Sequence, residues 1–90
     1  MSQPASLEIQ AVVIDVLKHV SRRPIGPTLA SDLVADLGFD SLQVLEAIAE
    51  LEDRFDVSVP LDEVPAARTV TQVIALIARL VNGVDTRSTR

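Results

Sequence analysis

Residues 36–55 read DLGFDSLQVLEAIAELEDRF, and this stretch decides the fold. Its large apolar side chains recur every three or four residues, the spacing that aligns them on one face of an α-helix, at Leu45, Ile48, Leu51 and Phe55. Asp40 can cap such a helix, because its carboxylate can accept hydrogen bonds from the free N–H groups of the first turn. The pattern therefore predicts a helix that begins at Ser41 and ends before the segment from Val57 to Pro60.

Two other segments have the same helical period. The first has apolar positions at Ile9, Val13, Val16, Leu17 and Val20. Ser6 is its expected N-cap. In the second, Thr69 and Gln72 form a capping-box pattern before an apolar stripe, and Asn82 with Gly83 supplies the stop. Between the two later helices, Pro65 limits a short helix to about one turn.

A loop of about twenty residues, from Ser21 to Asp40, is predicted between the first two long helices, because it contains two prolines and two glycines. One helical turn is expected from Ser31 to Ala35. Apolar side chains are expected to pin the loop to the core, namely Leu29, Leu33, Val34 and Leu37. The predicted fold is all-α, a small bundle of three long helices and one short helix in a single domain with its core at about 6–82 and a flexible tail at 83–90.

Composition excludes several classes of function. The 90 residues include no cysteine, which rules out disulfides, thiolate zinc sites and a cysteine nucleophile. No basic run followed by an apolar stretch opens the sequence, and no apolar stretch approaches the roughly 20 residues of a membrane span. We therefore expect a soluble, cytoplasmic protein. We also expect it to be a monomer.

The negative charge is concentrated in the middle of the chain. Residues 36–63 contain nine acidic residues and one basic residue, Arg54, so this segment carries −8 while the rest of the chain carries +3. Such a segment would repel nucleic acid, which needs clustered basic residues. It is equally compatible with an ordinary solvated face and with docking of proteins that carry basic patches.

Ser41 places a hydroxyl at the first turn of a helix, where free N–H groups and the helix dipole favour negative charge. A serine there, close to the flexible Gly38 and directly after a capping aspartate, can accept a phosphodiester bond. The same serine can also serve only to begin the helix, which is the more common role of a serine at this position. Local spacing alone leaves both interpretations open.

The run from Asp36 to Leu42 resembles the attachment signature of the acyl carrier protein family. The similarity continues through Val44 to Phe55, Asp56 to Pro60 and Thr69-Val70, so about fifty residues match in order and spacing. Pro65 and Arg68 depart from the commonest family pattern, and the pair Arg22-Arg23 makes the loop unusually basic.

This resemblance implies that Ser41 receives phosphopantetheine from coenzyme A by the action of a separate phosphopantetheinyl transferase. The arm's thiol would then carry acyl groups to acyl-transferring, ketosynthase or acyl-ligase enzymes of fatty acid, polyketide or related lipid biosynthesis. Gly38, Asp40 and Leu42 match the attachment motif. The positions matching the family's docking surface are Asp40, Leu42, Val44, Glu46, Glu52 and Asp53. Core positions that could shelter a growing chain are Leu45, Ile48, Leu51, Ile74 and Ile77.

Other readings predict different chemistry. An aminoacyl or peptidyl carrier would use the same serine, whereas an acidic interaction module would never be modified. A hydrolase pairing Ser41 with His19 lacks a strand-to-helix elbow in so short a helical chain. Asp32, Asp36 and Asp40 recur every four residues but lack the spacing of a calcium loop, so no metal site is predicted.

Overall fold

The computed structural model describes residues 4–83, and the side chains of residues 7–83. It contains α1 (Pro4–Val20), α2 (Ser41–Phe55), the 3-10 helix η1 (Leu61–Ala66) and α3 (Val70–Val81). Within this range there is no strand beyond one isolated antiparallel bridge between Asp32 and Thr69. The predicted all-α bundle of three long helices and one short one is confirmed. Most of the predicted tail, residues 84–90, lies outside the described range.

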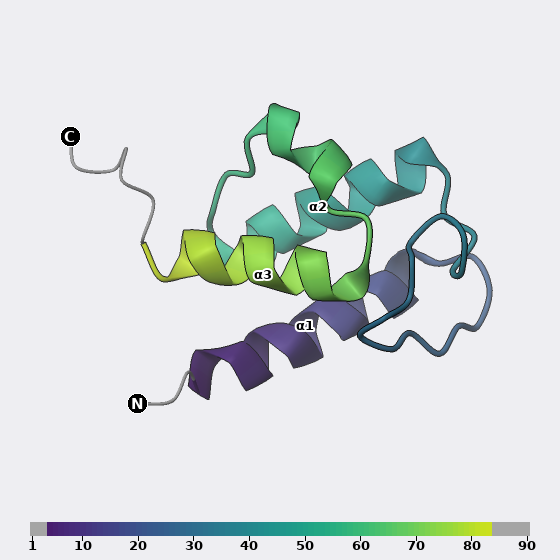
Figure 1. Ribbon diagram of the computed structural model, residues 1–90, viewed down its shortest axis with the longest axis horizontal. Coiled ribbons are helices and arrows are strands. Elements are labelled where there is room, and N and C mark those ends of the chain that lie inside the picture. The colour runs from purple at the N-terminus through teal and green to yellow at the C-terminus, as the bar shows by residue number, and fades with distance from the viewer. Residues whose placement is uncertain (1–3, 84–90) are drawn as a thin grey trace.

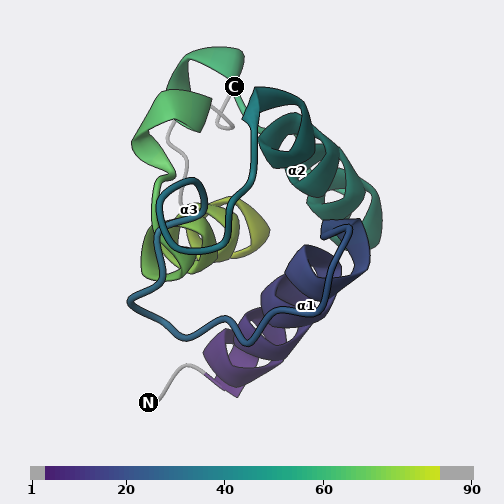
Figure 2. The same cartoon turned by 90° about the vertical axis from the view of Figure 1, so that its right-hand side faces the viewer.

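The three long helices surround a common core. α1 contacts both α2 and α3, and α3 lies between α1 and η1 in Figure 1. The loop between α1 and α2 crosses one end of the bundle, where α1 ends and α2 begins (Figure 2). None of the described helices has the length and apolar character needed to cross a bilayer.

The core is built from the helical stripes that the sequence pattern predicts. The largest fully buried side chains come from all three long helices and from the loop, and they are Ile9, Val13, Val16, Leu17, Leu33, Leu51, Val70, Val73 and Ile77. Burying a side chain of this size stabilises the fold by about 1.5–3 kcal/mol before entropy is counted.

The start of α1 differs from the prediction, whereas the loop contains the single turn that was expected near Ser31 to Ala35. α1 begins at Pro4, so Ser6 lies inside the helix and is not its N-cap. Proline suits a first turn, because the N–H that it lacks would have no helical partner there. In the loop, the backbone N–H groups of Asp36 and Leu37 close a single turn on the Asp32 carbonyl at 2.9 and 3.0 Å.

The loop is held partly by side chains and partly by its backbone. Leu33 and Leu37 are buried as predicted, but Leu29 and Val34 are 44% and 60% exposed. The Leu29 carbonyl, rather than its side chain, fixes this part of the loop by accepting the N–H and hydroxyl of Thr71 at 3.0 and 2.7 Å. The prediction was therefore wrong for two of the four apolar anchors.

Leu45 was expected in the core but is 45% exposed. The buried residues of α2 are Gln43, Ala47, Ile48 and Leu51. At 100° per residue, this set centres the buried face well away from Leu45, which therefore lies beyond the edge of the stripe. Gln43 occupies a buried position of α2, which a pattern of apolar residues alone could not predict.

The ends of the later elements follow local backbone geometry. α2 ends at Phe55, because Asp56 adopts a left-handed conformation with φ of 56°. η1 spans six residues with Pro65 inside it, which is longer than the single turn predicted. Thr69 caps α3 through a complete capping box with Gln72, and Asn82 is the C-cap, as the sequence predicted.

Candidate functional site

The first turn of α2 is fixed by a capping box. Asp40 Oδ1 accepts the Gln43 N–H at 2.8 Å, and Gln43 Oε1 accepts the Asp40 N–H at 3.2 Å. Because the Gln43 side chain is buried, this pair also anchors the helix start to the core. Ser41 is therefore the first helical residue, as predicted.

The turn before Ser41 requires glycine. Gly38 has φ of 77°, and a Cβ atom there would lie 2.6 Å from the Arg23 guanidinium. The next residue, Phe39, is buried and donates its N–H to the Leu33 carbonyl at 2.9 Å. This anchor on one side and the capping box on the other hold Ser41 in a defined place.

Ser41 itself is exposed. Helix geometry leaves the N–H groups of Ser41 and Leu42 without intrahelical acceptors. Within the described residues neither N–H has another protein acceptor, because Asp40 takes only the N–H groups of Gln43 and Val44. An accessible hydroxyl and two unpaired donors thus meet at the positive end of the helix dipole.

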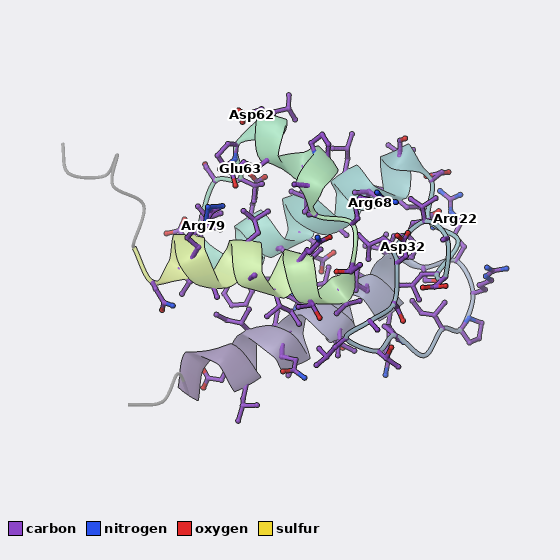
Figure 3. The ribbon with its side chains drawn as sticks, viewed as in Figure 1. Arg22, Asp32, Asp62, Glu63, Arg68 and Arg79 are labelled. Atoms are coloured by element: carbon purple, nitrogen blue, oxygen red, sulfur yellow. The ribbon has the colours of Figure 1, made fainter. Side chains whose placement is uncertain are left out.

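A cavity of about 500 Å³ opens beside this serine. Seven of its lining residues are apolar, contributed by the loop, α2 and the η1 region: Leu33, Val34, Val44, Leu45, Val64, Pro65 and Ala67. The three polar lining residues are Asp32, Ser41 and Arg68. In Figure 3 the side chains of Asp32 and Arg68 lie next to each other, close to the beginning of α2.

Asp32 and Arg68 form a loose ion pair at the cavity. Arg68 Nη2 lies 3.7 Å from Asp32 Oδ2. Asp32 Oδ1 accepts the N–H groups of Val34 at 2.9 Å and Ala35 at 2.8 Å. The Ala35 hydrogen bond is the main cause of a lowered pKa of Asp32, which burial opposes and Val34 and Arg68 reinforce. The aspartate is thus held ionised by its own turn.

The predicted docking residues occupy α2 in different ways. Leu42 is 57% exposed, and Glu46 and Asp53 are also exposed. Val44 is half-buried and lines the cavity. Glu52 is half-buried, and its Oε2 accepts the Val59 N–H at 2.7 Å, which ties the segment after α2 back to the helix.

The residues of the competing readings lie elsewhere. His19 Nδ1 is 3.2 Å from Glu50, in the second half of α2 rather than at its first turn. Asp36 Oδ2 accepts the Asp32 N–H at 2.7 Å, and Asp40 caps α2. No group of three or more potential metal ligands occurs among the described residues.

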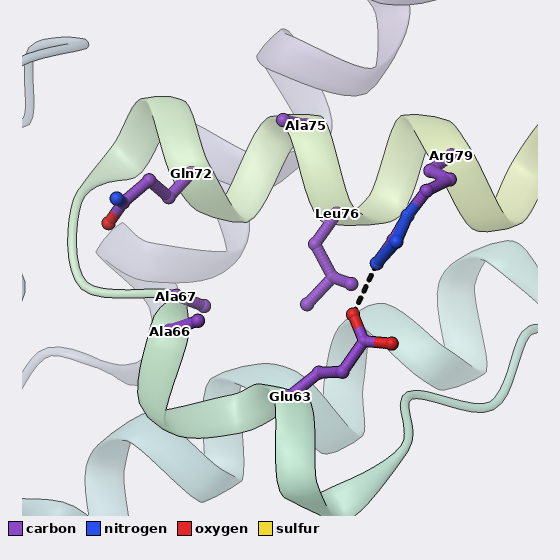
Figure 4. A pocket seen from close by; sticks show the side chains of 7 residues that line it. All are labelled: Glu63, Ala66, Ala67, Gln72, Ala75, Leu76 and Arg79. Carbon is purple, nitrogen blue, oxygen red and sulfur yellow. Dashed lines mark hydrogen bonds and ion pairs between the residues drawn. The ribbon is translucent and has the colours of Figure 1, made fainter.

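Sequence reasoning did not place Arg68 and Asp32 with Ser41. Arg68 is far from Ser41 in the chain, and Asp32 lies in the preceding loop, where no helical period links it to Ser41. The structure also contains a second cavity of about 320 Å³ between η1 and α3, where Arg79 pairs with Glu63 (Figure 4). The two cavities are lined by different residues, except that Ala67 borders both.

Comparisons with known proteins point to one family. The family model described as a phosphopantetheine attachment site matches residues 8–77. An acyl carrier protein from Amoebophilus asiaticus is 36% identical over 73 residues, covering 80% of this chain and 91% of the relative. One from Streptomyces coelicolor is 35% identical over 74 residues, covering 82% and 78%.

Structural comparison gives the same result. A solved structure from Mycobacterium tuberculosis, described as an acyl carrier protein, superimposes with a TM-score of 0.73. It is 33% identical and covers 78% of this chain and 95% of its own. With a family match over most of its length and relatives of similar size, the chain belongs to the acyl carrier protein family, whose attachment domain holds a covalent phosphopantetheine group.

Proposed function

We propose that Ser41 is the residue that carries the phosphopantetheine arm, and that the arm's thiol carries acyl groups between enzymes. One observation carries the assignment: the exposed Ser41 hydroxyl lies at the start of α2, beside two N–H groups with no acceptor among the described residues. Its relatives are carriers rather than catalysts, so the protein serves as a substrate of other enzymes.

The chemistry of the site fits a phosphodiester. The Ser41 oxygen would form the new bond to phosphorus and lose its proton, while the bond from phosphorus to the nucleotide part of coenzyme A breaks. The Ser41 and Leu42 N–H groups can then donate to the phosphate oxygens, as helix starts commonly do for anions. The bound arm would supply a thiol, which this cysteine-free chain lacks.

The exposed face of α2 is suited to partner enzymes with basic patches. Glu46 and Asp53 supply negative charge, which favours rapid encounter and correct orientation, and Leu42 supplies an exposed apolar contact. Glu52 contributes charge but is engaged by the Val59 N–H. The partners would be the phosphopantetheinyl transferase and acyl-transferring, ketosynthase or acyl-ligase enzymes.

The cavity beside Ser41 favours acyl cargo over aminoacyl cargo. Its lining is predominantly apolar, and about 500 Å³ can hold a short acyl chain. A charged α-amino group would lose hydration there with only Asp32 as a partner. We place the protein in fatty acid or related lipid or polyketide biosynthesis, as a single-domain cytoplasmic monomer.

The test is the intact mass of the purified chain after incubation with coenzyme A and a broad-specificity phosphopantetheinyl transferase. The wild type should gain the mass of one arm, and Ser41→Ala should gain none. Ser58→Ala is the matched control, because Ser58 is also exposed but lies outside any helix start, and it should be loaded fully. A folded wild-type chain that gains no mass would instead be an unmodified interaction module.

A further inference from the structure

Of the described residues, those that line the Ser41 cavity include one cation, Arg68. Its backbone is fixed on both sides, because its carbonyl accepts the Leu33 N–H at 2.9 Å and its own N–H donates to Gln72 Oε1 at 3.0 Å. The base of the side chain therefore cannot move away from the cavity without breaking the contact between the loop and the start of α3.

The Arg68 guanidinium is weakly engaged in this structure. Its distance of 3.7 Å from Asp32 Oδ2 is too long for a hydrogen bond, and the Arg68 side chain is 73% exposed. Arg68 contributes less to holding the Asp32 charge than the Asp32 turn does, since the Val34 and Ala35 N–H groups already bind the other carboxylate oxygen. Among the described residues the Arg68 guanidinium has no other ion-pair partner, so it can leave Asp32 at little cost.

A phosphodiester on Ser41 would create a need for such a cation. It would place a second negative charge directly after the Asp40 carboxylate, which already caps the helix. The two free N–H groups of the helix start offset this repulsion only in part. An arginine fork can donate two parallel hydrogen bonds to two phosphate oxygens, which a lysine cannot do.

Resting on the proposed attachment at Ser41, we propose that Arg68 is a positioning residue for the phosphopantetheine arm. Its guanidinium exchanges Asp32 for the oxygens of the phosphodiester on Ser41 and so directs the first part of the arm across the cavity mouth. An anionic oxygen could also come from a carboxylate on the cargo. The arm's phosphodiester is favoured as the ligand, because it is present whatever the cargo is and is tied to a residue of the same cavity.

The test uses the full chain labelled with ¹⁵N-arginine, before and after loading with the arm without cargo. Wild type, Arg68→Gln, Arg68→Lys and Arg23→Gln are compared. Arg23 is the matched control, since its guanidinium lies against Gly38 but does not line the cavity. Intact mass reports loading, the arginine Nε–H signals report contacts, and ³¹P transverse relaxation reports the mobility of the phosphodiester.

In the wild type, the Arg68 Nε–H signal, identified by its absence in Arg68→Gln, should shift on loading. ³¹P relaxation should be slower in Arg68→Gln, intermediate in Arg68→Lys and unchanged in Arg23→Gln. About 1 M salt should bring the wild type to the Arg68→Gln value, because the Debye length falls to about 3 Å.

Several results would overturn the proposal while leaving Ser41 as the attachment residue. The first is an Arg68 Nε–H signal that does not shift on loading. The second is equal ³¹P relaxation in wild type and Arg68→Gln, and the third is slower ³¹P relaxation in Arg23→Gln instead. An Arg68 signal that moves only when a carboxylate-bearing cargo is loaded would assign the guanidinium to the cargo and also refute the proposal. A wild-type chain that gains no mass would overturn the attachment at Ser41 and this inference with it.

Discussion

The starts of α2 and α3 use the same capping chemistry and differ in what remains free. Asp40 with Gln43 and Thr69 with Gln72 both form complete capping boxes. At α3, however, the first two helical N–H groups donate to loop carbonyls, Val70 to Ser31 and Thr71 to Leu29, each at 3.0 Å. At α2 the corresponding N–H groups, of Ser41 and Leu42, have no acceptor among the described residues.

This difference separates a helix start that closes the fold from one that can bind an anion. Val70, the first residue of α3, is fully buried, whereas Ser41 is exposed. A capping motif in the sequence identifies where a helix begins. Whether the free N–H groups of that helix start bond to the rest of the fold or remain available to a ligand depends on whether another segment of the chain covers them.

The largest expected difference between the two helix starts is in packing. Leu33 is 2% exposed and is hydrogen-bonded to Arg68 just before α3, whereas Leu42 at the start of α2 is 57% exposed. Leu33→Ala should lower the free energy of unfolding by about 2–5 kcal/mol. Leu42→Ala should change it by less than about 0.5 kcal/mol. Urea unfolding measures both, and similar losses in the two variants would contradict the contrast.

The second difference concerns the caps themselves. Thr69→Ala and Asp40→Ala should each cost about 1 kcal/mol, since each removes one side-chain acceptor from a helix start. Only Asp40→Ala should also slow arm addition at Ser41, which intact-mass kinetics measures. Asp40→Asn, which keeps an acceptor oxygen, is the control for stability. Equal slowing in Thr69→Ala would show that loading follows overall stability and not the start of α2.

The third difference is electrostatic. Glu46 and Asp53 lie exposed on α2, and the double variant Glu46→Gln/Asp53→Asn should reduce the rate of transferase-catalysed loading by about two- to tenfold at low salt. Stopped-flow or initial-rate measurements should show the difference fading at high salt. The control Glu8→Gln/Asp62→Asn removes two exposed charges outside α2. An equal reduction in the control would mean that only net charge matters.

The smallest expected effect is at the loop that covers α3. The lowered pKa of Asp32 means that its contribution to stability is present above the unfolded pKa, about 4, and is lost as the pH falls through the lower folded pKa. Asp32→Asn should therefore be slightly less stable than the wild type at pH 7. Thermal unfolding across acidic pH should show the two converging, and a constant difference would refute this role.

Much of the fold was predictable because helical periods and caps are local. The beginning of α2 at Ser41 and the cap of α3 at Thr69 follow from residues within one turn. The errors arose where tertiary contacts determine which side chains are buried. Leu45 fits an apolar stripe, yet the buried Gln43 shifts the core-facing side of α2 away from it.

The candidate site was predictable in the same limited sense. Ser41 could be selected as the candidate attachment residue from the capping aspartate, the nearby glycine and the resemblance to the family signature. The presence of Asp32 and Arg68 in its cavity depends on the loop crossing the end of the bundle and pairing with the segment before α3. No periodic pattern in the sequence predicts where this loop lies on the bundle.

The most direct test of the central claim is to locate the added arm by fragmentation of the loaded wild-type chain. The peptide of residues 23–54 contains two serines, Ser31 and Ser41. The Ser31 carbonyl accepts the Val70 N–H of α3, whereas Ser41 lies at the open start of α2. The added mass is expected on Ser41 alone. An arm found on Ser31, on Ser58 or on any residue other than Ser41 would contradict the claim that the open start of α2 is the attachment site.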